Sequence, residues 1–169
     1  MDVGSVPYGV AYDSAKGEVF VTNLGSSSVS VISDGDDEVI ATLNVGSQPV
    51  GVAYDPGKGE AFVANTLSNS VSVIADSDNV VVANVTGGSY PFGLTYDAAK
   101  GEVFVGNQVS ETVSVISDSV SSSTSSRSSS SSLSTAFSLL AGAQAGAILL
   151  LASATMRRIG RRGVRSIKT

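Results

Sequence analysis

Short runs of β-branched and aromatic residues, separated by polar turns, follow one another along residues 1–119. In the first unit, residues 10–12 are apolar and 13–17 form a polar turn that ends in Gly. Residues 18–22 are rich in Val and Phe, 28–32 alternate polar with apolar positions, and 39–45 form a further apolar run. Alternation with a period of two predicts strands, and Asp and Gly between the runs predict tight turns. The unit therefore predicts four antiparallel strands.

The same unit recurs every 42 residues without an insertion. Tyr12, Tyr54 and Tyr96 mark the period, and an Asp follows each of them. Four strands in a repeat of about 40 to 45 residues is the spacing of β-propeller blades, whereas a helical repeat needs apolar residues three, four and seven positions apart. The period also aligns Pro7, Pro49 and Pro91, the Lys-Gly-Glu triplets at 16–18, 58–60 and 100–102, and Val-Ser-Val-Ile at 29–32, 71–74 and 113–116.

One tetrapeptide in each unit carries a family resemblance. Phe-Val-Thr-Asn at 20–23, Phe-Val-Ala-Asn at 62–65 and Phe-Val-Gly-Asn at 104–107 resemble the Tyr-Val-Thr-Asn signature of the YVTN family of β-propeller repeats. The flanking Pro-x-Gly-Val-Ala-Tyr-Asp, Lys-Gly-Glu and Val-Ser-Val-Ile segments are similar to the same family. Phe replaces the first Tyr of the signature, which keeps the ring and removes a hydroxyl. The resemblance implies all-β propeller blades at about 3–44, 45–86 and 87–119.

The number of units is small for a propeller. Closed propellers typically have about four to eight blades, and closure removes exposed sheet edges. Here there are three units, and the third lacks a fourth strand because Ser119–Ser123 follow Asp118. Asp2–Ser5 matches the end of a unit, so the chain enters the repeat midway. We expect the chain to be the C-terminal part of a longer propeller. Assembly with itself or with a sister chain, and an open three-bladed arc, are the alternatives.

Charge divides the chain into two parts. All 15 carboxylates lie between Asp2 and Asp118, where only three lysines oppose them, which gives a net charge of −12. From Val120 onward there are seven cations and no acid. The acidic part would repel phosphate, so we predict that the protein does not bind nucleic acid.

The residues after the repeats predict a linker and a membrane span. Ser occupies ten of the twelve positions 121–132, so 120–132 is predicted to be a flexible linker. The 24 residues 133–156 are uncharged. At about 1.5 Å per residue they can cross a hydrocarbon core of about 30 Å as one transmembrane helix. A buried core helix is the alternative.

A basic tail at 157–169 follows the predicted span. We expect this tail to stay in the cytoplasm and to contact anionic lipid, which places residues 1–119 outside the cell. Met1–Ser5 has neither a basic start nor an apolar stretch for export, so an absent N-terminal portion would explain both the missing signal and the missing blades. A C-terminal sorting signal that is cleaved is the alternative to a retained span. The cations next to the span are Arg157, Arg158, Arg161 and Arg162.

The absence of His, Cys and Trp excludes several chemistries. Zinc sites of His and Cys, Cys nucleophiles, Ser-His-Asp relays and disulfides all need side chains that this sequence lacks. The repeated polar residues are predicted to be structural: Asp13, Asp55 and Asp97 as turn caps, the Lys-Gly-Glu triplets as solvated hairpins, and Asn23, Asn65 and Asn107 as partners of local backbone.

Two weaker candidates for sites remain. The acidic loop Asp34, Asp36, Asp37 and Glu38 offers the oxygen ligands that Ca²⁺ prefers, but its spacing fits no defined calcium loop, so a solvated loop is expected. Asn84-Val85-Thr86 is an N-glycosylation sequon that lies in a predicted strand.

These features predict a non-enzymatic, membrane-anchored surface protein that displays a β-propeller for adhesion, envelope structure or ligand binding. No catalytic or cofactor-binding residue is identified, and the expected partners are the membrane and further blades in the same or another chain. The alternative is a C-terminal fragment of an extracytoplasmic propeller enzyme or binding protein, lactonase-like or quinoprotein-like, whose site lies on other blades.

Overall fold

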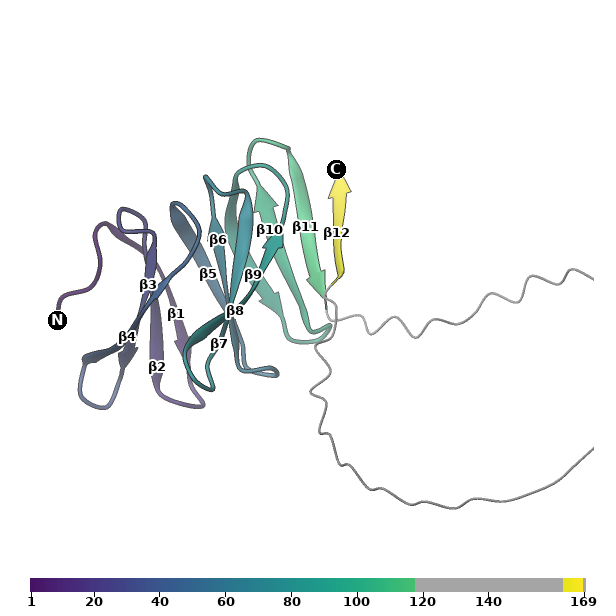
Figure 1. The fold of residues 1–169 in the computed structure, drawn as a ribbon. Coiled ribbons are helices and arrows are strands. Elements are labelled where there is room, and N and C mark those ends of the chain that lie inside the picture. Colours follow the sequence, from purple (N-terminus) through teal and green to yellow (C-terminus); the bar gives the residue numbers. More distant parts are fainter. Residues whose placement is uncertain (118–162, 169) are drawn as a thin grey trace, which may run out of the picture. The chain divides into compact units, whose positions relative to one another are not determined.

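The computed structural model describes residues 1–117 and 163–168, which form three four-stranded antiparallel sheets (Figure 1). The first sheet contains β1 (Pro7–Asp13), β2 (Glu18–Asn23), β3 (Ser28–Ser33) and β4 (Glu38–Asn44). The second contains β5 (Pro49–Asp55), β6 (Glu60–Asn65), β7 (Ser70–Ala75) and β8 (Val80–Thr86). The third contains β9 (Pro91–Asp97), β10 (Glu102–Asn107), β11 (Thr112–Ser117) and β12 (Gly163–Lys168). The all-β class and the four-stranded unit are confirmed.

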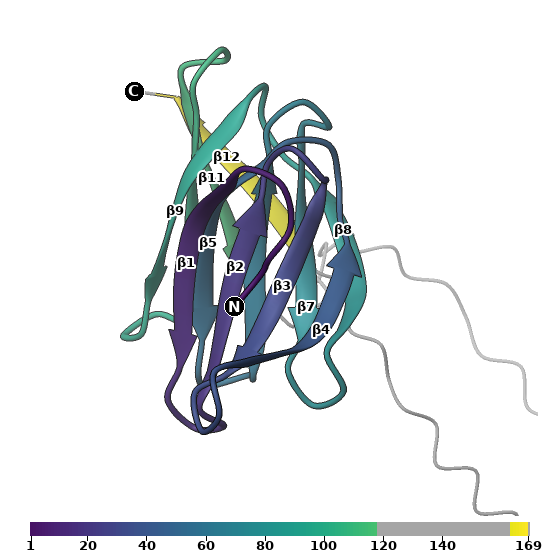
Figure 2. The same cartoon turned by 90° about the vertical axis from the view of Figure 1, so that its left-hand side faces the viewer.

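Each unit folds as the local turn chemistry predicts. Within the first sheet, β1, β2, β3 and β4 are neighbours in chain order, as Figure 2 shows from its face. The turn from β1 to β2 ends at Gly17, whose φ of 68° lies in the left-handed region. The Gly17 amide donates to the Asp13 carbonyl at 3.0 Å. Gly59 and Gly101 adopt the same conformation at the repeat positions, so one turn design serves all three hairpins.

The apolar side chains of neighbouring sheets form two cores. Between the first and second sheets, Phe20 and Val31 pack with Val63 and other buried residues. Between the second and third, Phe62 packs with Val105 in a cluster of the same kind. Sheet-to-sheet contact is extensive along β1, β5 and β9 and sparse between β4 and β8. The strands β1, β5 and β9 are therefore the inner strands of the stack, and β4 and β8 are outer strands.

The fourth strand of the third sheet comes from the end of the chain. The sequence predicts that this unit stops after three strands, but Gly163–Lys168 pairs antiparallel with β11, with Ser117 opposite Gly163 and Thr112 opposite Lys168. The physical reason is general: the outer edge of β11 carries backbone N–H and C=O groups that any extended segment can pair. This pairing needs no repeat signature, so the 42-residue period does not reveal it.

The predicted linker at 120–132, the predicted transmembrane helix at 133–156 and most of the basic tail lie outside the described residues. Within residues 1–117 and 163–168, no helix has the length and apolar character that a membrane span requires.

Candidate binding surface

The charged residues of the repeats gather at one end of the sheets. We call the end that carries the β1–β2 and β3–β4 hairpins, and their repeat equivalents, the acidic end. Of all charged residues in 1–117, only Asp2 and Glu111 lie elsewhere. The members are the lysines 16, 58 and 100 and the acids Asp13, Glu18, Asp34, Asp36, Asp37, Glu38, Asp55, Glu60, Asp76, Asp78, Asp97 and Glu102.

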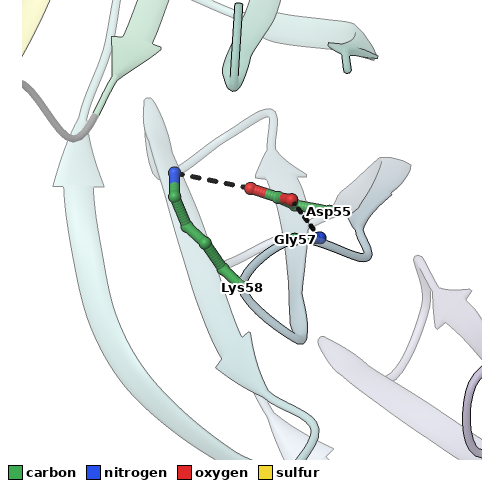
Figure 3. Close-up of polar contacts among 3 residues, drawn as sticks. All are labelled: Asp55, Gly57 and Lys58. Carbon is green, nitrogen blue, oxygen red and sulfur yellow. Dashed lines mark hydrogen bonds and ion pairs between the residues drawn. The ribbon is translucent and has the colours of Figure 1, made fainter. Parts of the chain in front are cut away.

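The repeated aspartates at the end of the inner strands cap the hairpin turns. Asp13 accepts a hydrogen bond from the Ala15 amide at 2.8 Å. Asp55 accepts one from the Gly57 amide at 2.8 Å and also pairs with Lys58 at 3.4 Å (Figure 3). Asp97 accepts one from the Ala99 amide at 2.9 Å, as the turn prediction requires.

The repeated tyrosines link these aspartates to the neighbouring sheet. The Tyr54 hydroxyl donates to Asp76 of its own sheet at 2.5 Å and also faces Asp13 of the preceding sheet. Tyr12 donates to Asp34 at 2.7 Å. Burial, followed by the hydrogen bonds to Asp76 and Asp13, raises the pKa of Tyr54, because all of these disfavour the phenolate. Sequence reasoning missed this link, although the period places an Asp 22 residues after Tyr12 and Tyr54.

The raised tyrosine pKa values predict a loss of stability in alkali. A hydrogen bond to Asp34 raises the pKa of Tyr12, and one to Asp55 raises that of Tyr96. Because the folded pKa lies above the unfolded value of 10.0, this stabilisation is complete below pH 10.0 and is lost as the pH rises toward the folded pKa. We expect the urea midpoint to be steady up to about pH 9 and to fall above it. The fall should be smaller in Tyr54→Phe, and an equal fall in both proteins would contradict the assignment.

The Lys-Gly-Glu hairpins are not simply solvated, so that expectation is wrong for the first of them. Glu18 is only 9% exposed and accepts a hydrogen bond from the Asn79 amide of the second sheet at 3.4 Å. Lys16 donates a hydrogen bond to the backbone carbonyl oxygen of Asp76, which also belongs to the second sheet. The adjacent sheet covers this hairpin, and a single sequence does not reveal such a neighbour.

The repeated asparagines bond side chains rather than local backbone, which corrects a second expectation. The Asn23 amide group donates to the Ser28 and Ser30 hydroxyls at 3.2 and 3.0 Å. Asn65 donates in the same way to Ser70 and Ser72. Each amide lies at a strand end and reaches the hydroxyls of the adjacent strand, whose own backbone groups are engaged in the sheet. The repeat conserves Asn because this position needs two donors on one side chain.

The two weak candidate sites are placed at exposed positions. Asp34 accepts a hydrogen bond from the Tyr12 hydroxyl, Asp36 and Asp37 are exposed in the same turn, and Glu38 is exposed at the start of β4. Among residues 1–117 and 163–168, no three metal-ligating side chains converge as a cation site would require. Asn84 lies in the outer strand β8 with an exposed side chain, and its amide oxygen accepts a hydrogen bond from Ser72 at 2.7 Å.

The opposite end of the sheets carries few charges, Glu111 among them, and exposes large apolar side chains. We call it the apolar end and define it by Val6, Tyr8, Leu67, Phe92 and Val109. Tyr8 and Phe92 come from the first and third sheets and meet edge to face, with ring centroids 6.0 Å apart. They are 56% and 40% exposed, respectively. Exposed aromatic rings that contact one another are candidates for a recognition surface.

This end is also where the repeats differ from one another. Tyr8 and Phe92 align with Val50, which is buried. Val6 aligns with Gln48 and Tyr90, and all three adopt positive φ although none is Gly. The signal was present in the sequence, because the residue after each repeated Pro varies while its neighbours do not. Its meaning depended on the fold, which brings positions of three blades to one end.

An open cavity of about 510 Å³ lies on the third sheet. Its lining includes Phe92 and Gly93 of β9, Gly106 and Asn107 of β10, and Val113 of β11. The cavity therefore extends from the apolar end onto the face of the third sheet that lies away from the second sheet.

Comparison with known proteins identifies the architecture. No profile of a known protein family and no curated protein matches the sequence. Virginiamycin B lyase from Staphylococcus aureus is similar with a TM-score of 0.59 and 18% identity, over 68% of this chain and 39% of that one. The β-propeller domain of Cps50 (Swd1) from Myceliophteria thermophila has a TM-score of 0.58 and 9% identity, over 69% and 37%. The sheets are β-propeller blades.

Hydrazine synthase from Kuenenia stuttgartiensis is similar as well, with a TM-score of 0.58 and 18% identity, over 72% of this chain and 46% of that one. The chain therefore spans less than half of each of these three proteins. At such identities the likeness shows the fold alone, and the activities of these proteins are not transferred to this one.

Proposed function

We propose that this chain is a non-enzymatic, membrane-anchored surface protein that displays YVTN-type propeller blades for adhesion or ligand binding. One observation carries the proposal: the Tyr-Asp pairs and Lys-Gly-Glu triplets repeat at the acidic end of every blade, whereas the exposed apolar side chains of the opposite end vary between blades. Residues that hold blades together are needed in every blade, as Asp13 and Tyr54 illustrate. Large exposed aromatic residues that differ between blades have no such structural task, and Tyr and Phe are enriched where proteins bind partners.

The direction of the chain supports display of the apolar end. The strand β11 runs from Thr112 at the apolar end to Ser117 at the acidic end. The Ser-rich linker and the predicted span follow Ser117 in sequence. A tether that starts at the acidic end leaves the apolar end free to face away from the membrane.

A single crossing by 133–156 has a structural consequence. It would place Gly163–Lys168 on the opposite side of the membrane from β11, so the two strands could not pair in the anchored protein. The 24 residues are too few to cross twice, since each crossing takes about 20 residues. The anchored form that we propose therefore has β12 separated from the third sheet and its basic residues in contact with cytoplasmic lipid.

Cysteine labelling tests this arrangement, and the absence of native cysteine leaves no background. In intact cells that export the chain behind an added cleavable secretion signal, a membrane-impermeant maleimide should label Leu67→Cys at the apolar end and should not label Lys168→Cys. Both should react after permeabilisation, which is the control for side-chain reactivity. Labelling of Lys168→Cys in intact cells would contradict the single crossing and would agree with β12 paired to β11.

The same cells test the binding surface. Their attachment to isolated cell envelopes should fall about tenfold or more in the double variant Tyr8→Ala and Phe92→Ala, the effect expected of an aromatic hot spot. The double variant Ile40→Ala and Val82→Ala is the matched control, because both side chains are exposed and apolar but lie on the outer strands. An equal fall in the control would contradict a role for the apolar end.

A further inference from the structure

Within the part of the chain that the structure describes, the first and third sheets each have one face that no other sheet covers, and these two faces are complementary. We infer that the free face of the third sheet binds the free face of the first sheet in a second copy of this chain. Two copies of three sheets would then close a ring of six, within the range of about four to eight blades of known propellers. The inference goes beyond the proposed surface role and does not depend on it.

Glycine positions show where a further sheet would dock. A Cβ atom on Gly9 would lie 2.3 Å from the Val50 carbonyl oxygen of the second sheet. A Cβ on Gly51 would lie 2.4 Å from the Phe92 carbonyl oxygen of the third. Both interfaces thus need glycine where the next sheet brings its backbone close. Gly93 occupies the same repeat position, and a Cβ there would meet nothing within 4 Å.

Two further positions near Gly93 are also buried in the first sheet and open in the third. In the first sheet, Thr22 and Val29 are fully covered by the second sheet. Their equivalents in the third sheet are Gly106, which is exposed, and Val113, which is half-buried. Both line the cavity of about 510 Å³. On the first and second sheets, the following sheet fills the equivalent space. The cavity therefore marks where a further sheet would pack on the third sheet.

The first sheet exposes the surface that would fill this place. Val10 is 65% exposed and Tyr12 is 53% exposed. Their repeat equivalents in the second sheet, Val52 and Tyr54, pack against the core shared with the first sheet. Tyr54 stacks on Phe20 with ring centroids 6.1 Å apart. In a head-to-tail contact, Tyr12 of the second copy would reach Phe104, the equivalent of Phe20.

Polar groups are matched across the two faces. Asp13 faces Tyr54 of the next sheet, and Asp55 faces Tyr96. Among residues 1–117 and 163–168, no tyrosine of a following sheet faces Asp97, and no aspartate of a preceding sheet faces Tyr12. A second copy would bring these two together.

The hairpin of the third sheet adds one favourable and one unfavourable contact. Lys100 would approach the Asp34–Glu38 loop of the second copy, as Lys16 approaches Asp76 within the chain. Asp37 stands where the second sheet has Asn79, so Glu102 would face a carboxylate at this one point. At each contact between the two copies, Lys100 would therefore be the cation nearest to the acidic loop of the other copy. Reversing the charge at Lys100 should weaken the ring.

The geometry also agrees with attachment to one membrane. Neighbouring sheets have their acidic ends on the same side, as the contacts of Lys16 with Asp76 and of Tyr54 with Asp13 show. Continuing the same rotation into a second copy puts both Ser117 residues at one end of the ring. Two tethers could then enter the same bilayer.

The mass of the full chain in mild detergent tests the inference, with the protein mass separated from that of the detergent by light scattering. We expect twice the chain mass of 17.0 kDa. Gly93→Ala should give a single chain with an unchanged circular dichroism spectrum, because its methyl group would collide with the second copy only. Gly87→Ala is the matched control and should remain a dimer, since its Cβ would lie 3.9 Å from the nearest atom. A single-chain mass for the unmodified protein would overturn the inference.

Crosslinking tests the orientation and does not depend on the folding of the glycine variants. A short bismaleimide should join chains only when Tyr12→Cys and Asp97→Cys proteins are mixed, because a head-to-tail contact brings position 12 of one copy to position 97 of the other. Each variant alone should stay uncrosslinked. Crosslinking of either variant with itself, or none in the mixture, would overturn the head-to-tail contact.

Discussion

Replacing Phe62 by alanine is expected to lower the free energy of unfolding by about 3–5 kcal/mol, the cost of truncating a buried Phe and leaving a cavity. Phe62 is 2% exposed and lies in the core between the second and third sheets. Domains are stable by only about 5–15 kcal/mol, so this loss would leave little of the native state under mild denaturing conditions. The measurement is urea unfolding of the full chain in mild detergent.

Phe92→Ala is the control for this prediction, because the same ring is removed from a position that is 40% exposed. We expect a loss of less than about 1.5 kcal/mol there, as less apolar surface returns to water. Equal losses in the two variants would show that the contact between the second and third sheets does not form in solution as described.

Gly51→Ala is expected to destabilise the protein by about 1–3 kcal/mol or more, as an overpacked interface does. The added methyl group would meet the Phe92 carbonyl oxygen at 2.4 Å, and backbone cannot move away as a flexible side chain can. The second and third sheets would have to separate locally, which should also expose Phe62. Urea unfolding is again the measurement.

Gly87→Ala serves as the control here too, since the residue is a glycine near the same interface with ordinary space around it. Its effect should be within about 0.5 kcal/mol of zero. A Gly51→Ala protein as stable as this control would contradict the close approach of β5 and β9.

Phe62 and Gly51 show that one repeat carries residues suited to the repeat that follows it. They lie in one sheet and both serve the contact with the next one. The repeat equivalents Phe104 and Gly93 are present in the third sheet, where no described residue of a further blade covers them. A sheet whose residues suit a neighbour is the structural basis for the head-to-tail contact inferred above.

Strand and turn positions were predictable because they depend on contacts within a few residues. Alternation along 28–32 and the Asp-to-Gly turn at 13–17 are local signals, and they recur in three copies that support one another. The turn role of Asp13 followed from the same chemistry. Predictions were wrong where a partner lies far away in sequence. Glu18 was predicted to be solvated, but its partner Asn79 lies 61 residues away and no local pattern indicates it.

The strand β12 and the apolar end were decided by tertiary structure in different ways. Pairing of Gly163–Lys168 with β11 satisfies the hydrogen-bonding needs of backbone N–H and C=O groups. Every residue type carries these groups, so no side-chain pattern predicts the pairing. Tyr8 and Phe92 were visible as variable positions, but their contact depends on the rotation between sheets. Neither fact could be reached from local propensity.

By itself, the sequence determined the architecture: an all-β chain of repeated four-stranded blades, an acidic repeat region and a basic end. Those properties depend on period, propensity and charge, which are additive along a chain. Only the tertiary structure decided that the charges of the repeats share one end, that the variable aromatic residues share the other, and that Gly93 lies on an open face. The physical reason is that each of these depends on distances between blades, and packing sets those distances.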